Sequence, residues 1–159
     1  MFAMLYAAVL FGIIFLVRTK NMVTFMVLFF LANLGVGFFN LIIWAFITDI
    51  IDHQEVMTGK REDGTVYAIY SFSRKLGQAL AGGVGGFALT AIGYVSDAPF
   101  QTEAVAGRIY SVATIVPAVC YLIVFLILLK AYPLTKNIVE ENANILRERH
   151  KKEDTDPNP

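Results

Sequence analysis

Four long apolar segments, separated by shorter polar ones, dominate the chain. Residues 1–17, 21–48 and 109–129 contain no charged side chain. A helix needs about 17–25 apolar residues to cross the hydrocarbon core of a bilayer. The pattern therefore predicts an all-α integral membrane protein. Its four transmembrane helices are expected over residues 2–17, 22–48, 65–94 and 108–131.

The polar segments set the expected organisation around these helices. Residues 49–64 are predicted to form a loop, and residues 132–159 a polar tail whose end, from Asp154 onward, is disordered. Part of the tail is predicted to form a short amphipathic helix that lies on the membrane surface. Three apolar positions define one side of this helix: Val139, Ala143 and Leu146.

Composition agrees with a membrane protein and excludes several other classes. Hydrophobic residues make up 57% of the chain and charged residues 16%, which lies well to the apolar side of ordinary soluble domains. The one cysteine, Cys120, excludes a disulfide framework and is expected to act as a small apolar residue. No phosphate loop, nucleophile–base pair or basic nucleic-acid-binding stripe occurs, so neither an enzyme nor a nucleic-acid-binding protein is indicated.

The distribution of lysine and arginine orients the predicted helices. The polar loop carries Lys60 and Arg61, and the tail carries five more basic residues, whereas the opposite side has Arg18, Lys20 and Arg108. Positive charge is enriched in cytoplasmic segments of membrane proteins. The loop and the carboxy terminus are therefore expected in the cytoplasm, on the inner side of the cell membrane. Because the chain opens directly in apolar sequence, it resembles the middle of a longer protein.

Lys75 is the charge of the third predicted helix that most needs an explanation. It lies about ten residues, or roughly 15 Å, from the cytoplasmic end of that helix, where its ammonium group reaches water poorly. A polar cavity for a substrate and a structural ion pair would each account for it. Arg74 is offset by about 100° around the helix and faces either a cavity or a partner helix.

An amide and an indole share one face of the preceding helix. Asn40 and Trp44 are one helical turn apart. Such a pair suits a sugar, because the indole offers a stacking plate and the amide offers hydrogen bonds. A tryptophan packed between two helices is the alternative.

Asp49 and Asp52 are also one turn apart, at the end of the same helix. Negative charge at a helix C-terminus opposes the helix dipole, so these carboxylates need compensation. Lys60 and Arg61 are the expected partners, in an ionic lock that forms and breaks. His53 has no accompanying set of metal ligands and is predicted to be a solvated interface histidine.

Small residues repeat at four-residue spacing in the third predicted helix, at Gly77, Ala81 and Gly85. Spacing of this kind lets two helix backbones approach closely in a membrane. The pattern predicts either a static packing face or a face that slides during transport.

An ordered set of motifs extends over nearly the whole chain. The motifs are Trp44-Ala45, Asp49-x-x-Asp52-His53-x-Glu55, Thr58-Gly59-x-Arg61-x-Asp63-Gly64, Lys75-x-Gly77 and Ile92-Gly93-Tyr94. In this order and spacing they resemble the glycoside–pentoside–hexuronide:cation symporters. These are sugar transporters of the major facilitator fold, of which the melibiose permease is typical.

The resemblance implies that the four helices are the last four of a twelve-helix symporter that couples sugar entry to Na⁺ or H⁺. It implies a sugar cavity and a cytoplasmic gate. With Trp44 included on the chemical ground given above, the expected substrate-binding residues are Lys75, Asn40, Trp44, Tyr70, Ser71 and Arg74. The expected gate residues are Asp49, Asp52 and Arg61. Asn40 stands where the melibiose permease has an aromatic residue, and His53 replaces the usual tyrosine.

The acidic residues that provide most of the family's cation site belong to amino-terminal helices that this chain does not contain. The expected partners are therefore a sugar or glycoside, the lipid bilayer and the missing amino-terminal half of the transporter. A coupling cation is expected, but no cofactor and no nucleic acid. Two alternatives stay open. One is a non-transporting membrane fragment or subunit that needs a separate amino-terminal half, and the other is a transporter of a non-sugar solute on the same fold.

Overall fold

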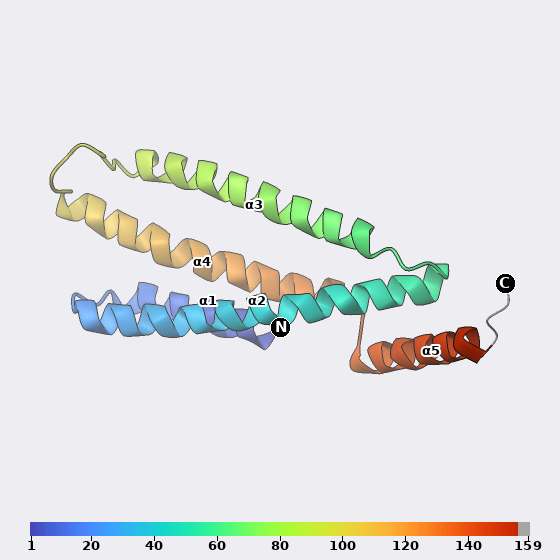
Figure 1. The fold of residues 1–159 in the computed structure, drawn as a ribbon. Coiled ribbons are helices and arrows are strands. Elements are labelled where there is room, and N and C mark those ends of the chain that lie inside the picture. Colours follow the sequence, from blue (N-terminus) through green and yellow to red (C-terminus); the bar gives the residue numbers. More distant parts are fainter. Residues whose placement is uncertain (156–159) are drawn as a thin grey trace.

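The protein is all-helical in the computed structural model, which describes residues 1–155 (Figure 1). Its five helices follow one another with short connections. They are α1 (Phe2–Val17), α2 (Met22–Thr58), α3 (Asp63–Ala91), α4 (Glu103–Ala131) and α5 (Lys136–Thr155). The predicted all-α class is thus confirmed, and the helix predicted in the tail is present. Of the disorder predicted from Asp154 onward, residues 156–159 lie outside the described residues, and α5 itself continues to Thr155.

Local signals in the sequence explain where α2 begins and ends. The side-chain oxygen of Asn21 accepts hydrogen bonds from the backbone N–H groups of Val23 (2.9 Å) and Thr24 (3.2 Å), which satisfies two donors of the first turn. At the other end Gly59 adopts a left-handed conformation with φ 71°, which glycine reaches without a steric penalty.

The predicted loop over residues 49–64 is wrong for most of its length. Residues 49–58 continue α2, and only residues 59–62 connect α2 to α3. The segment is charged, but it contains no glycine or proline before Gly59, so nothing in it stops the helix. With 37 residues α2 is about 55 Å long, which exceeds the roughly 30 Å hydrocarbon core. Its charged end can therefore project into water while remaining helical.

Within residues 1–155, α2 and α4 are long and apolar enough to cross a membrane, and α1 is a shorter apolar helix. The prediction of four membrane-spanning helices included α3 as well. That helix is long enough, with 29 residues, but its serines, Gln78, Arg74 and Lys75 reduce its apolar character.

α1 lies between α2 and α4 and forms the packed centre of the molecule. Phe11, Ile14 and Ala32 make up the buried cluster, and aromatic rings of α2 and α4 surround it. Tyr110 of α4 donates a 2.7 Å hydrogen bond to the Ile14 carbonyl, and its ring lies 5.5 Å from that of Phe25. Apolar side chains therefore pack inside the bundle as well as lying on its surface.

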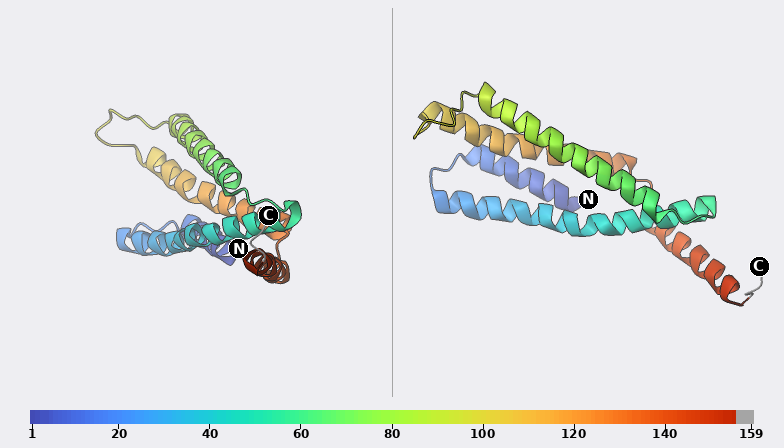
Figure 2. Two further views of the ribbon diagram at one scale, coloured as in Figure 1. Left: turned by 45° about the vertical axis from the view of Figure 1, so that its right-hand side comes forward. Right: turned by 45° about the horizontal axis from the view of Figure 1, so that its top comes forward.

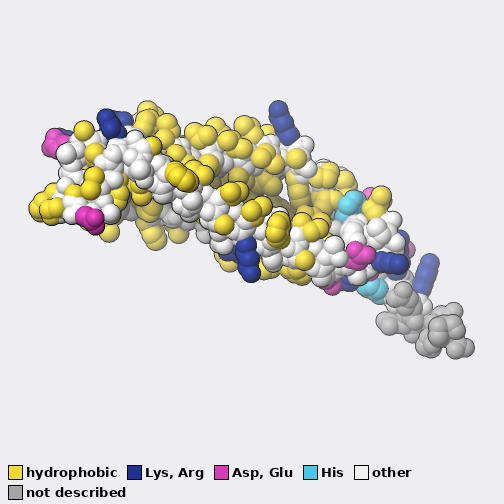
Figure 3. Space-filling model, turned by 90° about the horizontal axis from the view of Figure 1, so that it is seen from above, with side chains coloured by type: hydrophobic (Ala, Val, Ile, Leu, Met, Phe, Trp, Pro, Cys, Tyr) yellow, Lys and Arg dark blue, Asp and Glu magenta, His cyan; other side chains and the backbone are white. Residues whose placement is uncertain are grey.

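The other two helices are attached at one end of this centre. α3 packs mainly against α2, and α5 extends past the end of α2 (Figures 1 and 2). Apolar side chains cover most of the face seen in Figure 3, and acidic side chains gather at its two ends. No residue of α3 is buried, and a Cβ atom added at Gly77 or Gly85 would meet nothing within 4 Å. The small-residue pattern of α3 thus has no packing partner within residues 1–155.

Replacing Gly35 with alanine is expected to lower the thermal stability of the chain. The added Cβ would lie 2.7 Å from the Tyr6 ring and 2.8 Å from the Ala3 carbonyl oxygen. The carbonyl is backbone and cannot rotate away, so α1 and α2 must separate, at a cost of about 1–3 kcal/mol. The midpoint of thermal unfolding of the purified chain in detergent measures the effect.

Gly37→Ala provides the matched control for this substitution. It lies two residues further along the same helix, and its Cβ would meet nothing within 4 Å. Because alanine favours helix over glycine by about 1 kcal/mol, Gly37→Ala should be neutral or stabilising. Equal unfolding midpoints for the two variants would contradict the close approach of α1 and α2.

Candidate functional site

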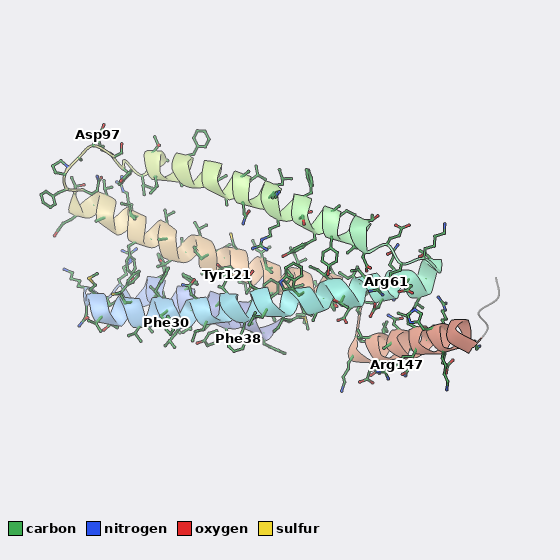
Figure 4. All side chains as sticks on the ribbon, in the orientation of Figure 1. Phe30, Phe38, Arg61, Asp97, Tyr121 and Arg147 are labelled. Atoms are coloured by element: carbon green, nitrogen blue, oxygen red, sulfur yellow. The ribbon has the colours of Figure 1, made fainter. Side chains whose placement is uncertain are left out.

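Arg61 joins the end of α2 to the start of α3 (Figure 4). Its Nη1 atom lies 3.0 Å from a carboxylate oxygen of Asp52 and 2.8 Å from one of Glu55. Its Nε atom lies 3.1 Å from a carboxylate oxygen of Asp63, the first residue of α3. The structure therefore brings together two of the predicted gate residues, Asp52 and Arg61, and adds two acidic partners.

Electrostatics explain why a single guanidinium holds three carboxylates. Asp52 and Glu55 are three residues apart on α2, so both occupy one side of the helix near its negative C-terminal end. Hydrogen bonds from Arg61 to Glu55 and Asp52 raise the pKa of the guanidinium further above its usual range. Within residues 1–155 no group of three or more metal-ligating side chains could hold a metal ion. Arg61 contacts all three carboxylates.

Asp49 lies apart from the Arg61 network. Its carboxylate accepts a 3.4 Å hydrogen bond from the hydroxyl of Tyr132, which directly follows α4. Burial, with the neighbouring Asp49 charge, raises the pKa of Tyr132 to about 12, so the hydroxyl keeps its proton. The side chain of Lys60, the other cation expected to compensate the two aspartates, forms no ion pair or hydrogen bond among the described residues.

Sequence reasoning missed Glu55, Asp63 and Tyr132 as partners of the gate residues. The three-residue spacing of Asp52 and Glu55 on one helix was a signal that could have identified Glu55. Tyr132 had no such signal, because it is 83 residues from Asp49 and reaches it only through helix packing.

α5 binds the last turn of α2 through polar groups. Arg149 donates hydrogen bonds to the backbone carbonyls of Glu55 (3.3 Å) and Val56 (3.2 Å). The last carbonyls of a helix lack partners within the helix. The Glu55 carbonyl also accepts the Gly59 N–H at 2.9 Å, whereas the partner of the Val56 carbonyl is Arg149. The Nε2 atom of His150 lies 3.6 Å from the Glu55 carboxylate. Glu55 is therefore shared between the Arg61 network and α5.

Each of the two helices also carries a buried apolar side chain. Leu146, on the predicted apolar side of α5, is 6% exposed, and Ile51 of α2 is 2% exposed. His53 does not remain a purely solvated residue as predicted, since its ring nitrogen lies 3.1 Å from the side-chain amide of Asn142. The tail helix is thus docked on the bundle end.

Leu146→Ala is expected to release α5 from α2. A buried leucine contributes about 2–5 kcal/mol, and α5 contacts the rest of the chain mainly through α2. Trypsin cleavage within α5 should therefore become at least about tenfold faster, since 1.4 kcal/mol corresponds to a factor of ten. The exposed Asn144→Ala is the control on the same helix and should leave the cleavage rate unchanged. Equal rates in both variants would show that burial of Leu146 does not hold α5 in place.

A second cluster joins α2 and α3 nearer the middle of the molecule. The Trp44 ring lies 5.8 Å from that of Tyr70 and 6.1 Å from that of Tyr67. The Tyr70 hydroxyl accepts a 3.4 Å hydrogen bond from Arg74. Three predicted substrate-binding residues, Trp44, Tyr70 and Arg74, are therefore brought together. Tyr67 completes the cluster and was missed, although it lies three residues before Tyr70 on the same helix.

The other predicted substrate-binding residues are not joined to this cluster by polar contacts. The Asn40 amide donates a 3.0 Å hydrogen bond to the Val36 carbonyl of its own helix. Ser71 and Lys75 are exposed on α3, and their side chains form no hydrogen bond or ion pair within residues 1–155. Lys75 thus presents a free ammonium group on a helix that packs mainly against α2.

Comparison with known proteins identifies the family. The family model described as MFS/sugar transport protein matches residues 1–136. The chain is 35% identical over 133 residues to the uncharacterized symporter YjmB of Bacillus subtilis (strain 168), which covers 84% of this chain and 28% of that protein. No solved structure matches the chain.

Two relatives from Escherichia coli (strain K12) agree with this result. A glucuronide carrier protein homolog is 36% identical over 118 residues, which is 72% of this chain and 25% of the relative. A putative sulfoquinovose importer is 42% identical over 87 residues, which is 52% of this chain and 19% of the relative. The chain therefore spans about a fifth to a quarter of the length of these two relatives.

The predicted non-enzymatic character is confirmed, because the matching proteins are transporters. The motif residues quoted above, the helical fold and the family match all lead to the same assignment. The chain belongs to the MFS/sugar transport protein family and, within it, to the glycoside–pentoside–hexuronide:cation symporters.

Proposed function

We propose that this chain forms the carboxy-terminal helices of a symporter that carries a sugar together with Na⁺ or H⁺ across the cytoplasmic membrane. The observation that carries the proposal is the Arg61 network on the family's motif residues. It ties the end of α2 to the start of α3 through contacts of 2.8–3.1 Å. Arginine–carboxylate contacts at a partly exposed helix junction can form in one state of a transporter and break in another.

In this proposal α1 to α4 are the four membrane-spanning helices and correspond to the last four of twelve. The Arg61 network and α5 lie on the cytoplasmic side, as the excess of lysine and arginine at that end favours. Alternating access requires two groups of helices that move about a central site. Since the chain covers 25–28% of two of its relatives, coupled transport is assigned to the complete transporter.

An acidic sugar fits the proposed site best. Glucuronides and sulfoquinovose, named for two of the relatives, each carry an anionic group at neutral pH. Arg74 and Lys75 on α3 offer two cations that an anionic group can use, and the neighbouring Trp44 and Tyr70 rings offer a surface for a sugar ring. Asn40, one turn before Trp44, would supply a hydrogen bond after leaving its own carbonyl.

Uptake of a radiolabelled glucuronide by cells that express the complete transporter tests the proposal. Accumulation should depend on a Na⁺ or H⁺ gradient and should be inhibited by unlabelled acidic sugars more than by neutral ones. The 159-residue chain expressed alone should accumulate no sugar. Inhibition only by non-sugar solutes would favour the alternative substrate class. Uptake unaffected by either gradient would contradict symport.

A further inference from the structure

An open pocket of about 370 Å³, lined by both charged and apolar groups, lies at the end of the bundle opposite the Arg61 network. It forms where α1 ends and where α2 and α4 begin. The α1–α2 turn contributes Arg18, Thr19 and Lys20 to its lining, and α4 contributes Glu103, Ala106, Gly107 and Tyr110. A volume of this size lies within the range of small-molecule sites, so it can hold a larger group than a single ion.

Arg18 is held in place at this cavity. Its guanidinium donates a 3.0 Å hydrogen bond to the Ser111 hydroxyl of α4 and lies 5.3 Å from the centre of the Phe15 ring. A guanidinium has five N–H donors, so most of them remain for a ligand. The backbone of Arg18 has φ 45°, a left-handed conformation that glycine or asparagine adopts more readily at a helix end. The position is therefore occupied by arginine against the local backbone preference.

Opposite charges line the cavity without neutralising each other. Among the described residues, the side chains of Lys20 and Glu103 form no hydrogen bond or ion pair. Two cations from the α1–α2 turn and a carboxylate from α4 match a ligand that carries both a negative and a positive group. Phosphate is a preferred anion of arginine and lysine, and a primary ammonium group donates to carboxylate.

The surroundings of the cavity are those of a membrane boundary. Leu16 and Val17, directly before the turn, are 78% and 54% exposed, and Met22 and Val23, directly after it, are 74% and 69% exposed. Charged groups that follow exposed apolar groups at the ends of spanning helices lie at the level of the lipid headgroups. A ligand at this level has its apolar part beside the helices.

We propose that this cavity binds the headgroup of a phospholipid that contains both a phosphate and a primary ammonium group, as phosphatidylethanolamine does. Arg18 and Lys20 bind the phosphate, and Glu103 accepts hydrogen bonds from the ammonium group. The site is separate from the proposed sugar site, and it depends only on the membrane location of the chain.

Native mass spectrometry of the purified 159-residue chain with added lipids tests the proposal. The probes are phosphatidylethanolamine, phosphatidylcholine and phosphatidylglycerol with identical acyl chains. Phosphatidylcholine has the same net charge as phosphatidylethanolamine, but its quaternary ammonium cannot donate a hydrogen bond to Glu103. The chain should bind phosphatidylethanolamine about tenfold more tightly than phosphatidylcholine, the factor expected for one charge-assisted hydrogen bond.

Three variants test the contacts between the lipid headgroup and the chain, and a fourth variant serves as the control. Glu103→Gln should remove the preference for phosphatidylethanolamine over phosphatidylcholine without weakening phosphatidylglycerol. Arg18→Gln and Lys20→Gln should each weaken all three lipids about tenfold. Lys60→Gln makes the same charge change at the opposite end of the molecule and should have no effect. Circular dichroism verifies that each variant is folded. If Arg18→Gln does not fold, the lipid preferences of Lys20→Gln and Glu103→Gln decide whether the proposal holds.

Equal binding of phosphatidylethanolamine and phosphatidylcholine by the unsubstituted chain would overturn the proposal, as would an unchanged preference in Glu103→Gln. Soluble phosphoethanolamine and inorganic phosphate distinguish a lipid site from a site for a free phosphate compound. Displacement of the lipid by either compound at equal concentration would also overturn it.

Discussion

Arg61→Gln is expected to loosen the junction between α2 and α3 and to lower sugar accumulation by the complete transporter. The substitution removes the cation that contacts Asp52, Glu55 and Asp63 at 2.8–3.1 Å. The three carboxylates then lie close together with no cation between them, and they repel one another across the junction. The two negative groups on α2 also remain at the unfavourable end of the helix dipole.

The partial exposure of the network sets the size of this effect. The Arg61 side chain is 43% exposed, so each ion pair is screened by water and contributes about 0.2–1 kcal/mol. Three such pairs sum to about 0.6–3 kcal/mol, which corresponds to roughly a 3- to 150-fold change in the equilibrium between the closed and open junction. Arg61→Lys should show a smaller change, because a lysine keeps the charge but lacks the planar fork that contacts several oxygens.

Hydrogen–deuterium exchange of the backbone amides of residues 59–66 measures the opening directly. In Arg61→Gln these amides should exchange faster by the same factor as the change in the equilibrium between the closed and open junction. Lys60→Gln is the matched control, since it makes the same charge change one residue away and its side chain has no ion pair among the described residues. Similar exchange in the two variants would show that the network does not hold the junction closed.

Lys75→Gln is expected to weaken binding of an acidic sugar by the complete transporter about ten- to hundredfold. Lys75 lies 12 residues after Asp63, the first residue of α3, which is roughly 18 Å along the helix. A hydrogen bond to a charged group contributes about 1.5–3 kcal/mol, which corresponds to this loss of affinity. Binding of the neutral methyl ester of the same sugar should change much less, because the ester has no anionic group for Lys75 to bind.

Thermal stability separates the two explanations that the sequence leaves open for Lys75. A lysine at the centre of a membrane helix costs about 2.5–3.5 kcal/mol, and Lys75 has no ion pair within residues 1–155 that would offset this cost. If Lys75 serves a substrate cavity, Lys75→Gln should leave the unfolding midpoint unchanged or raise it. If Lys75 serves a structural ion pair, the midpoint should fall.

Both measurements on Lys75 use the same pair of variants. Lys75→Arg, which keeps the positive charge, is expected to retain more affinity for the acidic sugar than Lys75→Gln. An affinity that is equal in the two variants and in the unsubstituted transporter would exclude Lys75 from the sugar site.

The ionic contact of Asp52 and Arg61 was predictable because both residues are close in the sequence. Nine residues separate them, and a helix end followed by a tight turn leaves few positions that a cation could occupy. The charged segment itself was misassigned to a loop, since high charge and helix formation are compatible wherever glycine and proline are absent. α2 ends only where Gly59 adopts the left-handed conformation at its C-cap.

The sequence by itself determined that four apolar helices and one tail helix form, and roughly where each begins. It also determined that the chain is a membrane protein and to which family it belongs. These properties depend on apolar runs, on caps such as Asn21 and on spaced motifs, all of which are local in the chain. Only the tertiary structure decided that Asp49 pairs with Tyr132, that Arg149 caps α2, and that Gly35, rather than Gly77, lies in a close helix contact. The first two pairs are 83 and 94 residues apart, and the way the helices pack determines which side chains meet.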